Sequence, residues 1–466
     1  MPTKKLKIHF IGIGGIGVSA LARYYLEKGV KVTGSDLVSS EITNALIEKG
    51  AKLFVGKHKI KNLPKDADLV IYSPAVPTDN PELKRAKKLG IKCQSYPEAL
   101  GELTKKYFTI AVSGTHGKST TTAMIGLLLV KAELDPTVIV GTKLKEFCDS
   151  NCRMGKSKYL VIEADEHMAS FLNYWPKIIV LTTIEADHLD YYKNLKNILK
   201  TFKKYVSHLP KDGILVSNKD DKNYTQFSTI IKNRVYYSFR EGNQQREVEK
   251  LKKILKIPGE HNVSNALAAL TVARTLKIPD KISFKALSEY RGSWRRFEEK
   301  EIIWQGKKIT IVSDYGHHPT EIKVTLKAAQ EKYPKRKIWC VYQPHQYQRT
   351  YYFFKDFVKV FKAAPVDKLI ITDIYDVAGR ETPKIKKRVS SEKLVKKIKK
   401  KSVIYLKMNE ILDYLKKNLR GGEVVIIMGA GDIYNLTGHL TEKEGRKKRT
   451  GDAPKTTGRP NLIAFH

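Results

Sequence analysis

The sequence predicts an α/β fold with three domains, and three observations support this prediction. The chain has 466 residues, which exceeds the roughly 100–200 residues of one ordinary domain. It is 41% hydrophobic, enough to fill several buried cores. Short apolar runs alternate with amphipathic helical runs along almost the whole chain. This alternation is typical of parallel sheets whose strands are connected by helices.

Strands are predicted where a short, β-branched apolar run lies between turn signals. Helical periodicity is clearest in "STTTAMIGLLLVKAEL" (residues 119–134) and "TEIKVTLKAAQEKYP" (residues 320–334). Two breaks in the alternation, near residues 103–107 and 290–300, predict domain boundaries. The predicted strands are residues 6–12, 30–34, 68–73, 108–113, 159–163, 178–182, 213–216, 308–313, 337–342, 367–372, 403–406 and 423–428.

Composition excludes several classes of protein. The net charge of +38 would suit a nucleic-acid-binding protein, but the lysines are spread along the whole chain and no recognition-helix, zinc-finger or RNA-binding pattern accompanies them. Nucleic acid is therefore not expected as the main partner, and a polyphosphate substrate explains the positive charge more simply. Residues 442–466 are basic and lack periodicity, so we expect a disordered tail.

The sequence also predicts a cytoplasmic protein. No apolar run approaches the roughly 18–20 residues that cross a membrane, and the first residues lack the apolar segment and cleavage site of a signal peptide. The four cysteines include no CxxC pair, which favours reduced thiols over a disulfide or metal framework. Whether the protein is a monomer or a homodimer stays open.

The first glycine motif lies at the N-terminus, in "KIHFIGIGGIGVSALARYYLEKG" (residues 7–29). A short apolar strand runs into Gly12, Gly14 and Gly17, and a helix follows. This arrangement places a pyrophosphate at a glycine turn and a helix N-terminus. On these residues alone, a nicotinamide dinucleotide would be the favoured ligand.

A second phosphate loop, "FTIAVSGTHGKSTTT", occupies residues 108–122. Its backbone N–H groups can bind phosphate oxygens, Lys118 supplies a positive charge, and the hydroxyl of Ser119 can bind Mg²⁺. The loop is shorter than the usual form, since Val112 stands where a first glycine is expected. These residues predict ATP binding in a domain of the P-loop ATPase type.

Acidic residues and a histidine follow two nearby strands. The carboxyl ends of parallel strands meet at one edge of a sheet, so these side chains are expected beside the phosphate loop and are read together as Mg²⁺ ligands. They are Glu163, Asp165 and Glu166 after one strand, and Glu185, Asp187, His188 and Asp190 after another.

These motifs, in this order, resemble those of the Mur ligase family, the ATP-dependent ligases that build the peptide stem of peptidoglycan. Within the family they are most similar to members that attach L-alanine to UDP-N-acetylmuramate. The resemblance covers nearly the whole chain to about residue 440. Besides the two glycine motifs, it rests on "GSD" (34–36), "EADE" (163–166), "DHLD" (187–190), "GEHNVSNALAAL" (259–270), "RGSWRRFE" (291–298), "DYGHHPTE" (314–321), "QPHQYQRT" (343–350) and "MGAGDIY" (428–434).

The resemblance implies a UDP-sugar domain over residues 1–104, a central ATP domain over 105–296 and a C-terminal Rossmann-like ligase domain over 297–441. The first glycine motif then binds UDP rather than NAD. The sugar carboxylate would be phosphorylated by ATP to an acyl phosphate, which the amine of L-alanine would attack. The implied UDP-sugar contacts are Gly14, Gly15, Ile16, Gly17, Ser35, Asp36 and Ser73.

The resemblance also implies the remaining site residues. Lys118, His188, Arg296 and His317 are the expected catalytic residues, and Ser119, Glu163 and His188 the expected Mg²⁺ ligands. Tyr315, His317, His345 and Arg349 are expected at the amino acid, with His318 nearby. The expected ATP contacts are Gly114, Thr115, His116, Gly117, Lys118, Ser119, Thr120, His261, Asn262, Asn265, Arg296 and Asp314.

Four features depart from the family pattern. They are "DEHM" at residues 165–168, Thr183, Gln346 and a short, charged segment at 240–258, which predicts a trimmed central domain. Three alternatives stay open: a recycling ligase that attaches a preformed peptide to the same sugar nucleotide, a basic nucleic-acid-dependent NTPase, and an NAD-linked Rossmann protein.

Overall fold

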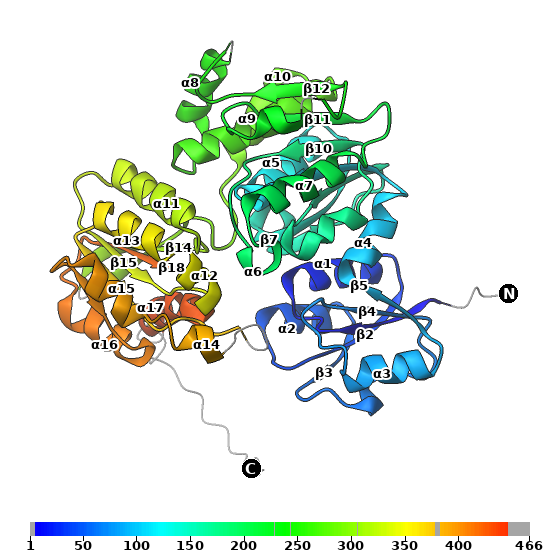
Figure 1. Cartoon of the computed structure of the whole chain (residues 1–466), viewed down its shortest axis with the longest axis horizontal. Helices are drawn as coiled ribbons and strands as arrows, with labels where there is room; N and C mark the ends of the chain where they lie inside the picture. Colours follow the sequence, from blue (N-terminus) through cyan, green and yellow to red (C-terminus); the bar gives the residue numbers. More distant parts are fainter. Residues whose placement is uncertain (1–4, 228, 243, 305, 378–382, 446–466) are drawn as a thin grey trace, which may run out of the picture. The chain divides into compact units, whose positions relative to one another are not determined.

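The structure is a computed structural model that describes residues 5–227, 229–242, 244–304, 306–377 and 383–445. It contains three separate sheets, as predicted (Figure 1). The chain divides into two compact units. The first unit comprises Met1–Glu298 and His318–Lys332, and the second comprises Glu299–His317 and Tyr333–His466.

The first sheet has five parallel strands in the order β3-β2-β1-β4-β5. Its central strand, "KIHFI", is buried along almost its whole length, as strands covered by helices on both faces are. The strands are β1 (Lys7–Ile11), β2 (Lys31–Asp36), β3 (Lys52–Val55), β4 (Leu69–Tyr72) and β5 (Lys92–Ser95). The helices are α1 (Ile16–Glu27), α2 (Glu41–Glu48), α3 (Pro81–Lys88) and α4 (Tyr96–Thr104).

The second sheet, also in the first unit, has the order β12-β11-β10-β6-β9-β7-β8. Its pairs are parallel except β7 with β8, which are antiparallel. Strand β6 lies in the middle, so the loop that follows it emerges at the centre of the sheet edge. The strands are β6 (Phe108–Ser113), β7 (Thr137–Leu144), β8 (Ser150–Arg153), β9 (Tyr159–Glu163), β10 (Ile178–Leu181), β11 (Ile214–Asn218) and β12 (Arg234–Tyr237).

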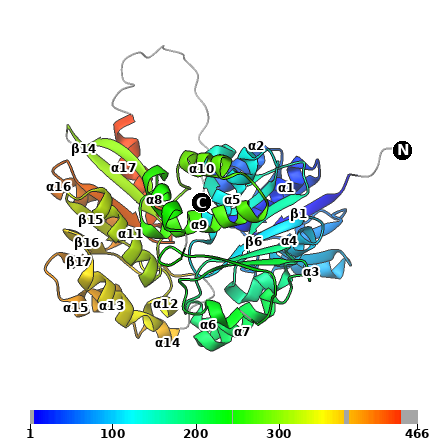
Figure 2. The ribbon, with the colours of Figure 1, turned by 90° about the horizontal axis from the view of Figure 1, so that it is seen from above.

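Two largely buried helices of the second sheet, α5 and α9, pack side by side (Figure 2). The segment expected to be trimmed contains α8, which buries Val248 and Leu251. Helix α11 follows the first strands of the third sheet in sequence but belongs to the first unit. The helices are α5 (Lys118–Lys131), α6 (Leu189–Tyr192), α7 (Leu195–Val206), α8 (Gln245–Ile254), α9 (Glu260–Thr275), α10 (Asp280–Glu289) and α11 (Pro319–Lys332).

The third sheet forms the core of the second unit, with the order β13-β14-β18-β15-β16-β17. Neighbouring strands are parallel from β14 through β18, β15 and β16 to β17. The strands are β13 (Glu298–Trp304), β14 (Lys307–Asp314), β15 (Ile338–Tyr342), β16 (Lys368–Ile371), β17 (Val403–Tyr405) and β18 (Val424–Met428). The helices are α12 (Tyr347–Tyr352), α13 (Phe354–Ala363), α14 (Pro383–Lys386), α15 (Ser391–Ile398), α16 (Met408–Asn418) and α17 (Asn435–Gly445).

Every predicted strand is present, with ends shifted by at most a few residues. The predicted helix at 119–134 is shorter than expected and ends at Lys131, since Glu133 adopts a positive φ of 60°. The prediction missed β3, β5, β7, β8, β12 and β13. Most of these are short or partly exposed strands whose apolar pattern is weak. The predicted tail, residues 442–466, lies mostly outside the described residues. No helix that the structure describes is long and apolar enough to span a bilayer.

Candidate active site

The phosphate loop connects β6 to α5 and is fixed by close packing. Gly114 and Gly117 have positive φ values of 132° and 80°, which favour glycine. A Cβ at Gly114 would lie 2.1 Å from the hydroxyl of Thr182, and one at Gly117 would lie 2.3 Å from Oδ1 of Asn265. The loop is therefore held against the end of β10 and the first turns of α9, and its N–H groups precede the helix N-terminus that favours an anion.

Lys118 begins α5 and is held by acidic side chains. Its Nζ donates to Oε2 of Glu166 at 2.8 Å and to the carbonyl of Gly114 at 2.7 Å, and lies 3.8 Å from Asp165. Burial alone would lower the pKa of Lys118, but the carboxylates of Glu166 and Asp165 outweigh it and raise the pKa above its ordinary value. The ammonium is charged and lies at the mouth of the phosphate loop.

Glu163 ends β9 next to Ser119. Its Oε1 accepts the N–H of Gly141 at 2.6 Å. Burial raises the pKa of Glu163, while hydrogen bonds from Gly141 and Ser119 and the charge of Arg296 oppose that rise. A partly buried carboxylate and a hydroxyl beside a phosphate loop are a suitable pair of oxygen ligands for Mg²⁺.

A second group of possible metal ligands contains Asp165, Glu166 and His188. Their ligand atoms all lie within 4.8 Å of one another. The rings of His167 and His188 are 4.5 Å apart, so the "DEHM" departure places an imidazole next to this group. His188 has a left-handed backbone with φ 49°, a conformation that is uncommon outside glycine and marks sites where the surrounding structure imposes it.

The first turn of α9 completes the loop's surroundings. Asn265 contacts Gly117, and its Nδ2 donates to Oδ1 of Asn262 at 3.3 Å. Burial lowers the pKa of His261 to about 4, so this imidazole is neutral at neutral pH. The structure therefore brings the predicted His261, Asn262 and Asn265 close to Gly114–Lys118, which lie 143 to 151 residues earlier in the chain.

The motif "RGSWRRFE" contains the adjacent arginines Arg295 and Arg296, and neither is an exposed surface charge. Arg295 is buried and has a φ of 57°. Arg296 is half-buried and interacts electrostatically with Glu163 and His261. Arg296, the predicted member of the site, thus interacts with the partly buried carboxylate of Glu163 beside Ser119.

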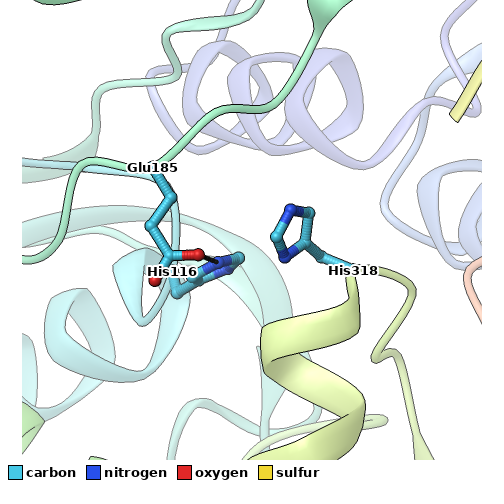
Figure 3. A group of neighbouring side chains, drawn as sticks. All are labelled: His116, Glu185 and His318. Carbon is cyan, nitrogen blue, oxygen red and sulfur yellow. Dashed lines mark ion pairs between the residues drawn. The ribbon is translucent and has the colours of Figure 1, made fainter. Parts of the chain in front are cut away.

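His116 joins the phosphate loop to the start of α11 (Figure 3). Its Nε2 lies 3.5 Å from Glu185 and its Nδ1 lies 3.3 Å from Glu321. Its ring is 4.8 Å from that of His318, and the hydroxyl of Thr320 donates to Glu185 at 2.7 Å. His318, expected near the amino acid, therefore lies beside the phosphate loop.

In the first domain, Asp36 holds the glycine turn. Its Oδ2 accepts the N–H of Gly14 at 2.7 Å. Ser35 is completely buried, and its hydroxyl donates to Glu82. A Cβ at Gly17 would lie 2.8 Å from the ring of Tyr96, so this glycine serves close packing. The other predicted UDP-sugar residues, Gly15, Ile16 and Ser73, lie at the same carboxyl edge of the sheet.

The second unit groups the predicted amino-acid residues at the carboxyl edge of its own sheet. The rings of Tyr315 and His317 are 5.4 Å apart, and those of His317 and His345 are 5.9 Å apart. Nη1 of Arg349 lies 3.4 Å from Nδ1 of His345. Asp314 ends β14, and its Oδ1 accepts the N–H of Gly316 at 2.8 Å.

The fold adds several residues to these groups that the sequence did not predict. The ring of Tyr375 stacks on His345 at 5.4 Å. The side chain of Gln343 bonds Asp432 at 2.8 Å and the N–H of Ile433 at 3.1 Å, so the "QPHQYQRT" and "MGAGDIY" motifs touch. Glu321 and Thr320 were also not predicted. They lie on the first turn of a predicted helix, and the sequence there does not indicate which distant residue a polar side chain will contact.

The sequence matches models of known protein families along most of its length. Three family models match in order: "Mur ligase family, catalytic domain" at residues 7–108, "Mur ligase middle domain" at 112–273 and "Mur ligase, glutamate ligase domain" at 295–431. The chain belongs to the Mur ligase family. The resemblance inferred from the motifs is confirmed.

Individual Mur ligases match over nearly their whole length. The UDP-N-acetylmuramate–L-alanine ligase of Acetivibrio thermocellus is 44% identical, with 93% of this chain and 95% of that protein covered. The ligase of the same name from Clostridium tetani is 42% identical, with 92% and 96% covered. The crystal structure of the UDP-N-acetylmuramate–alanine ligase of Thermotoga maritima has a TM-score of 0.78 at 27% identity and covers 95% and 100%.

A murein peptide ligase from Psychrobacter arcticus has a TM-score of 0.69 at 22% identity, covering 93% of this chain and 98% of that protein. This likeness shows that the two share the fold. The similarities favour neither the nucleic-acid-dependent NTPase nor the NAD-linked protein, since all of these relatives are Mur ligases.

We expect the first glycine turn to bind the sugar nucleotide, so replacing Asp36 with alanine should raise the KM for that substrate roughly tenfold and leave the KM for ATP little changed. The reason is that Asp36 fixes the first glycine turn through Gly14 and lies in a different sheet from the ATP loop. Initial-rate kinetics with each substrate varied will measure this. Asp66→Ala, an exposed carboxylate of the same domain, is the control. Equal effects on both substrates would contradict the prediction.

The pH dependence of stability is expected to report on His116. Burial would lower its pKa, but hydrogen bonds with Glu185 and Glu321 raise it from 6.5 to about 9. Tighter proton binding in the folded state stabilises the fold fully below pH 6.5, and this contribution is lost as the pH rises through about 9. The wild-type melting temperature should therefore fall between pH 7 and 9.5, and less steeply in His116→Asn. Parallel slopes for the two proteins would contradict this.

Proposed function

We propose that this Mur ligase joins L-alanine to the lactyl carboxylate of UDP-N-acetylmuramate, with conversion of ATP to ADP and phosphate. The observation that carries the proposal is the 44% identity, over 93% of the chain, to a ligase named for this reaction. The geometry of the site supports this proposal. The first sheet carries the glycine turn held by Asp36, and the second carries the phosphate loop with its carboxylates. The third carries the pair formed by Arg349 and His345.

The reaction has two steps. An oxygen of the sugar carboxylate attacks the γ-phosphorus of ATP, ADP leaves, and an acyl phosphate forms. The nitrogen of L-alanine then attacks the acyl carbon, the amine loses a proton and phosphate leaves, so an amide bond remains. Carboxylate and triphosphate are both anionic and repel each other, so catalysis depends mainly on charge neutralisation and positioning.

Lys118 supplies the first part of this neutralisation. Its ammonium pairs with Glu166, and in this proposal it also faces the terminal phosphates of ATP. The loop N–H groups of Gly114–Ser119 and the hydroxyl of Thr120 bind phosphate oxygens, while His261, Asn262, Asn265 and Arg296 bind the rest of the nucleotide. Asp314, on the third sheet, is assigned to the ATP ribose.

The donor set fits Mg²⁺, a hard cation that prefers carboxylate and hydroxyl oxygens. Ser119 and Glu163 would hold one ion, and His188 with Asp165 and Glu166 would hold a second. When bound, Mg²⁺ offsets negative charge on the phosphates. Burial raises the pKa of Glu163, and a neighbouring cation would favour the ionised carboxylate that burial penalises.

The second unit supplies the amino-acid site in this proposal. The guanidinium of Arg349 can bind both oxygens of the L-alanine carboxylate. Tyr315, His317 and His345 surround the same edge of the sheet. We assign UDP-sugar binding to residues 1–104, ATP binding to 105–296 and amino-acid binding to 297–441. ATP and the sugar nucleotide place the reaction in the cytoplasm.

One experiment tests the proposal directly. Phosphate release is measured with ATP, Mg²⁺, UDP-N-acetylmuramate and each of the twenty amino acids, and the products are weighed by mass spectrometry. L-Alanine is expected to give the highest kcat/KM and a product heavier by one alanine residue. Turnover only with a preformed tripeptide would instead identify a recycling ligase, and ATP turnover that responds to DNA or RNA but not to alanine would overturn the ligase assignment.

A further inference from the structure

A fully buried carboxylate lies beneath the nucleotide end of the first sheet. Glu82, on the first turn of α3, has no exposed surface. One oxygen accepts hydrogen bonds from His9 Nε2 and Ser35 Oγ, both at 2.8 Å. The other accepts from His58 Nδ1 at 2.9 Å and Asn62 Nδ2 at 3.0 Å. We call these five residues the Glu82 network.

The network keeps Glu82 ionised. Burial alone would raise its pKa, but the four side-chain hydrogen bonds outweigh burial and lower the pKa to about 2. A buried charge is costly to maintain and is often retained where it fixes the orientation of other groups. His58 is the member of the network that reaches the surface, since its side chain is 14% exposed.

The hydrogen bonds of His58 assign its ring. Nδ1 faces Glu82 and also lies 3.1 Å from the hydroxyl of Ser35, which itself donates to Glu82. Nδ1 therefore carries a proton, which makes Nε2 the acceptor of the ring when the ring is neutral. Within the described part of the chain, no hydrogen-bond partner reaches Nε2, and this atom is not among the buried atoms that lack one. The acceptor is thus open to a ligand.

His58 lies where the base of a nucleotide is expected. It follows β3, and the N–H of Gly56, two residues earlier, donates to the carbonyl of Asp36 at the carboxyl end of β2. In open α/β sheets, nucleotides bind outside the carboxyl ends of the strands, where the strand order reverses beside β1. Leu37 and Val38, next to Asp36, are 60% and 66% exposed and offer an apolar surface to a flat base.

We propose that His58 selects the base of the sugar nucleotide by accepting the N3–H of uracil at Nε2, and that the Glu82 network positions it for this role. Cytosine has an acceptor at N3, so in a complex with a cytidine nucleotide this atom would face Nε2 of His58, which is also an acceptor. The inference rests on the proposed function, because that function supplies a uridine nucleotide as the occupant. Ser35, predicted to contact this substrate, then acts through His58.

The test measures binding of UDP, CDP and N3-methyl-UDP to the full chain by isothermal titration calorimetry. Loss of one hydrogen bond at a partly buried acceptor is expected to weaken binding roughly 10- to 100-fold. The wild-type protein should therefore bind UDP more tightly than CDP and N3-methyl-UDP by such a factor. Equal affinity for UDP and N3-methyl-UDP would overturn the proposal without the use of any variant.

Variants test the residue and its support. His58→Phe is expected to bring the three affinities close together, while ADP binding at the phosphate loop is unchanged. Glu82→Gln is expected to reduce the preference for UDP over the other two nucleotides although the imidazole of His58 is still present. Unfolding would not lower this preference selectively. Lys59→Ala, an exposed neighbour, should keep the wild-type preference.

The outcomes separate this inference from the proposed function. Full UDP preference in His58→Phe would overturn the role of His58 but leave uridine binding, and hence the ligase assignment, intact. No binding of any uridine nucleotide to the wild-type chain would overturn both. Retained kcat with a raised KM for the sugar nucleotide in His58→Phe would support base selection, since His58 lies in a different sheet from the phosphate loop.

Discussion

Lys118→Ala is expected to reduce ADP formation from ATP, UDP-N-acetylmuramate and L-alanine by at least about 10³-fold. Lys118 is the only lysine whose ammonium, among the described residues, bonds the carbonyl of Gly114 in the phosphate loop. The alanine variant leaves the γ-phosphate without this charge when the anionic carboxylate approaches. A coupled assay for ADP at saturating substrates measures the loss.

The matched control is Lys131→Ala at the other end of the same helix. Lys131 pairs with Glu289 on the protein surface, where an exposed ion pair contributes only about 0–1 kcal/mol. Both variants should melt within a few degrees of the wild-type protein. Near-wild-type turnover by Lys118→Ala, or an equal loss in Lys131→Ala, would remove the phosphate loop from the mechanism.

His188→Asn is expected to raise the Mg²⁺ concentration needed for half-maximal activity roughly 10- to 100-fold, with a lower kcat at saturating metal. His188 shares a group of possible metal ligands with Asp165 and Glu166, so its loss weakens Mg²⁺ binding. The two carboxylates remain and still attract the cation, so binding is weakened and not abolished. A titration of activity against Mg²⁺ at fixed ATP gives both quantities.

The control for this variant is His439→Asn, since His439 is exposed on α17 of the second unit. Its Mg²⁺ dependence should match the wild-type curve. An unchanged Mg²⁺ requirement in His188→Asn would show that this histidine is not a metal ligand and that the group around Glu166 serves Lys118 alone.

Local sequence was sufficient to predict much of the fold. The apolar run "FTIAVS" predicts a buried strand because its side chains are apolar at nearly every position, and β6 is buried throughout after its first residue. Strands such as β3 and β5 were missed because they lie at sheet edges, where partly exposed side chains weaken the apolar pattern. Strand order also could not be predicted, since pairing joins segments far apart, such as β14 and β18.

The same division applies to the candidate site. The glycines, Lys118 and Ser119 were predictable because a phosphate loop is built from consecutive residues whose backbone makes the contacts. The partners of His116 were not, because Glu185 and Glu321 lie 69 and 205 residues further along the chain. No local spacing records which carboxylate a given imidazole will meet.

The sequence by itself determined the Mur ligase family, the two glycine elements and most of the strands, since each depends on residues that are neighbours in the chain. Only the tertiary structure decided that Ser35 is buried while His58 reaches the surface, and that His318 lies beside His116. The physical reason is that hydrogen bonds and ion pairs act over a few ångströms in space. Folding brings distant segments within that range, and it does so through packing that no single stretch of sequence contains.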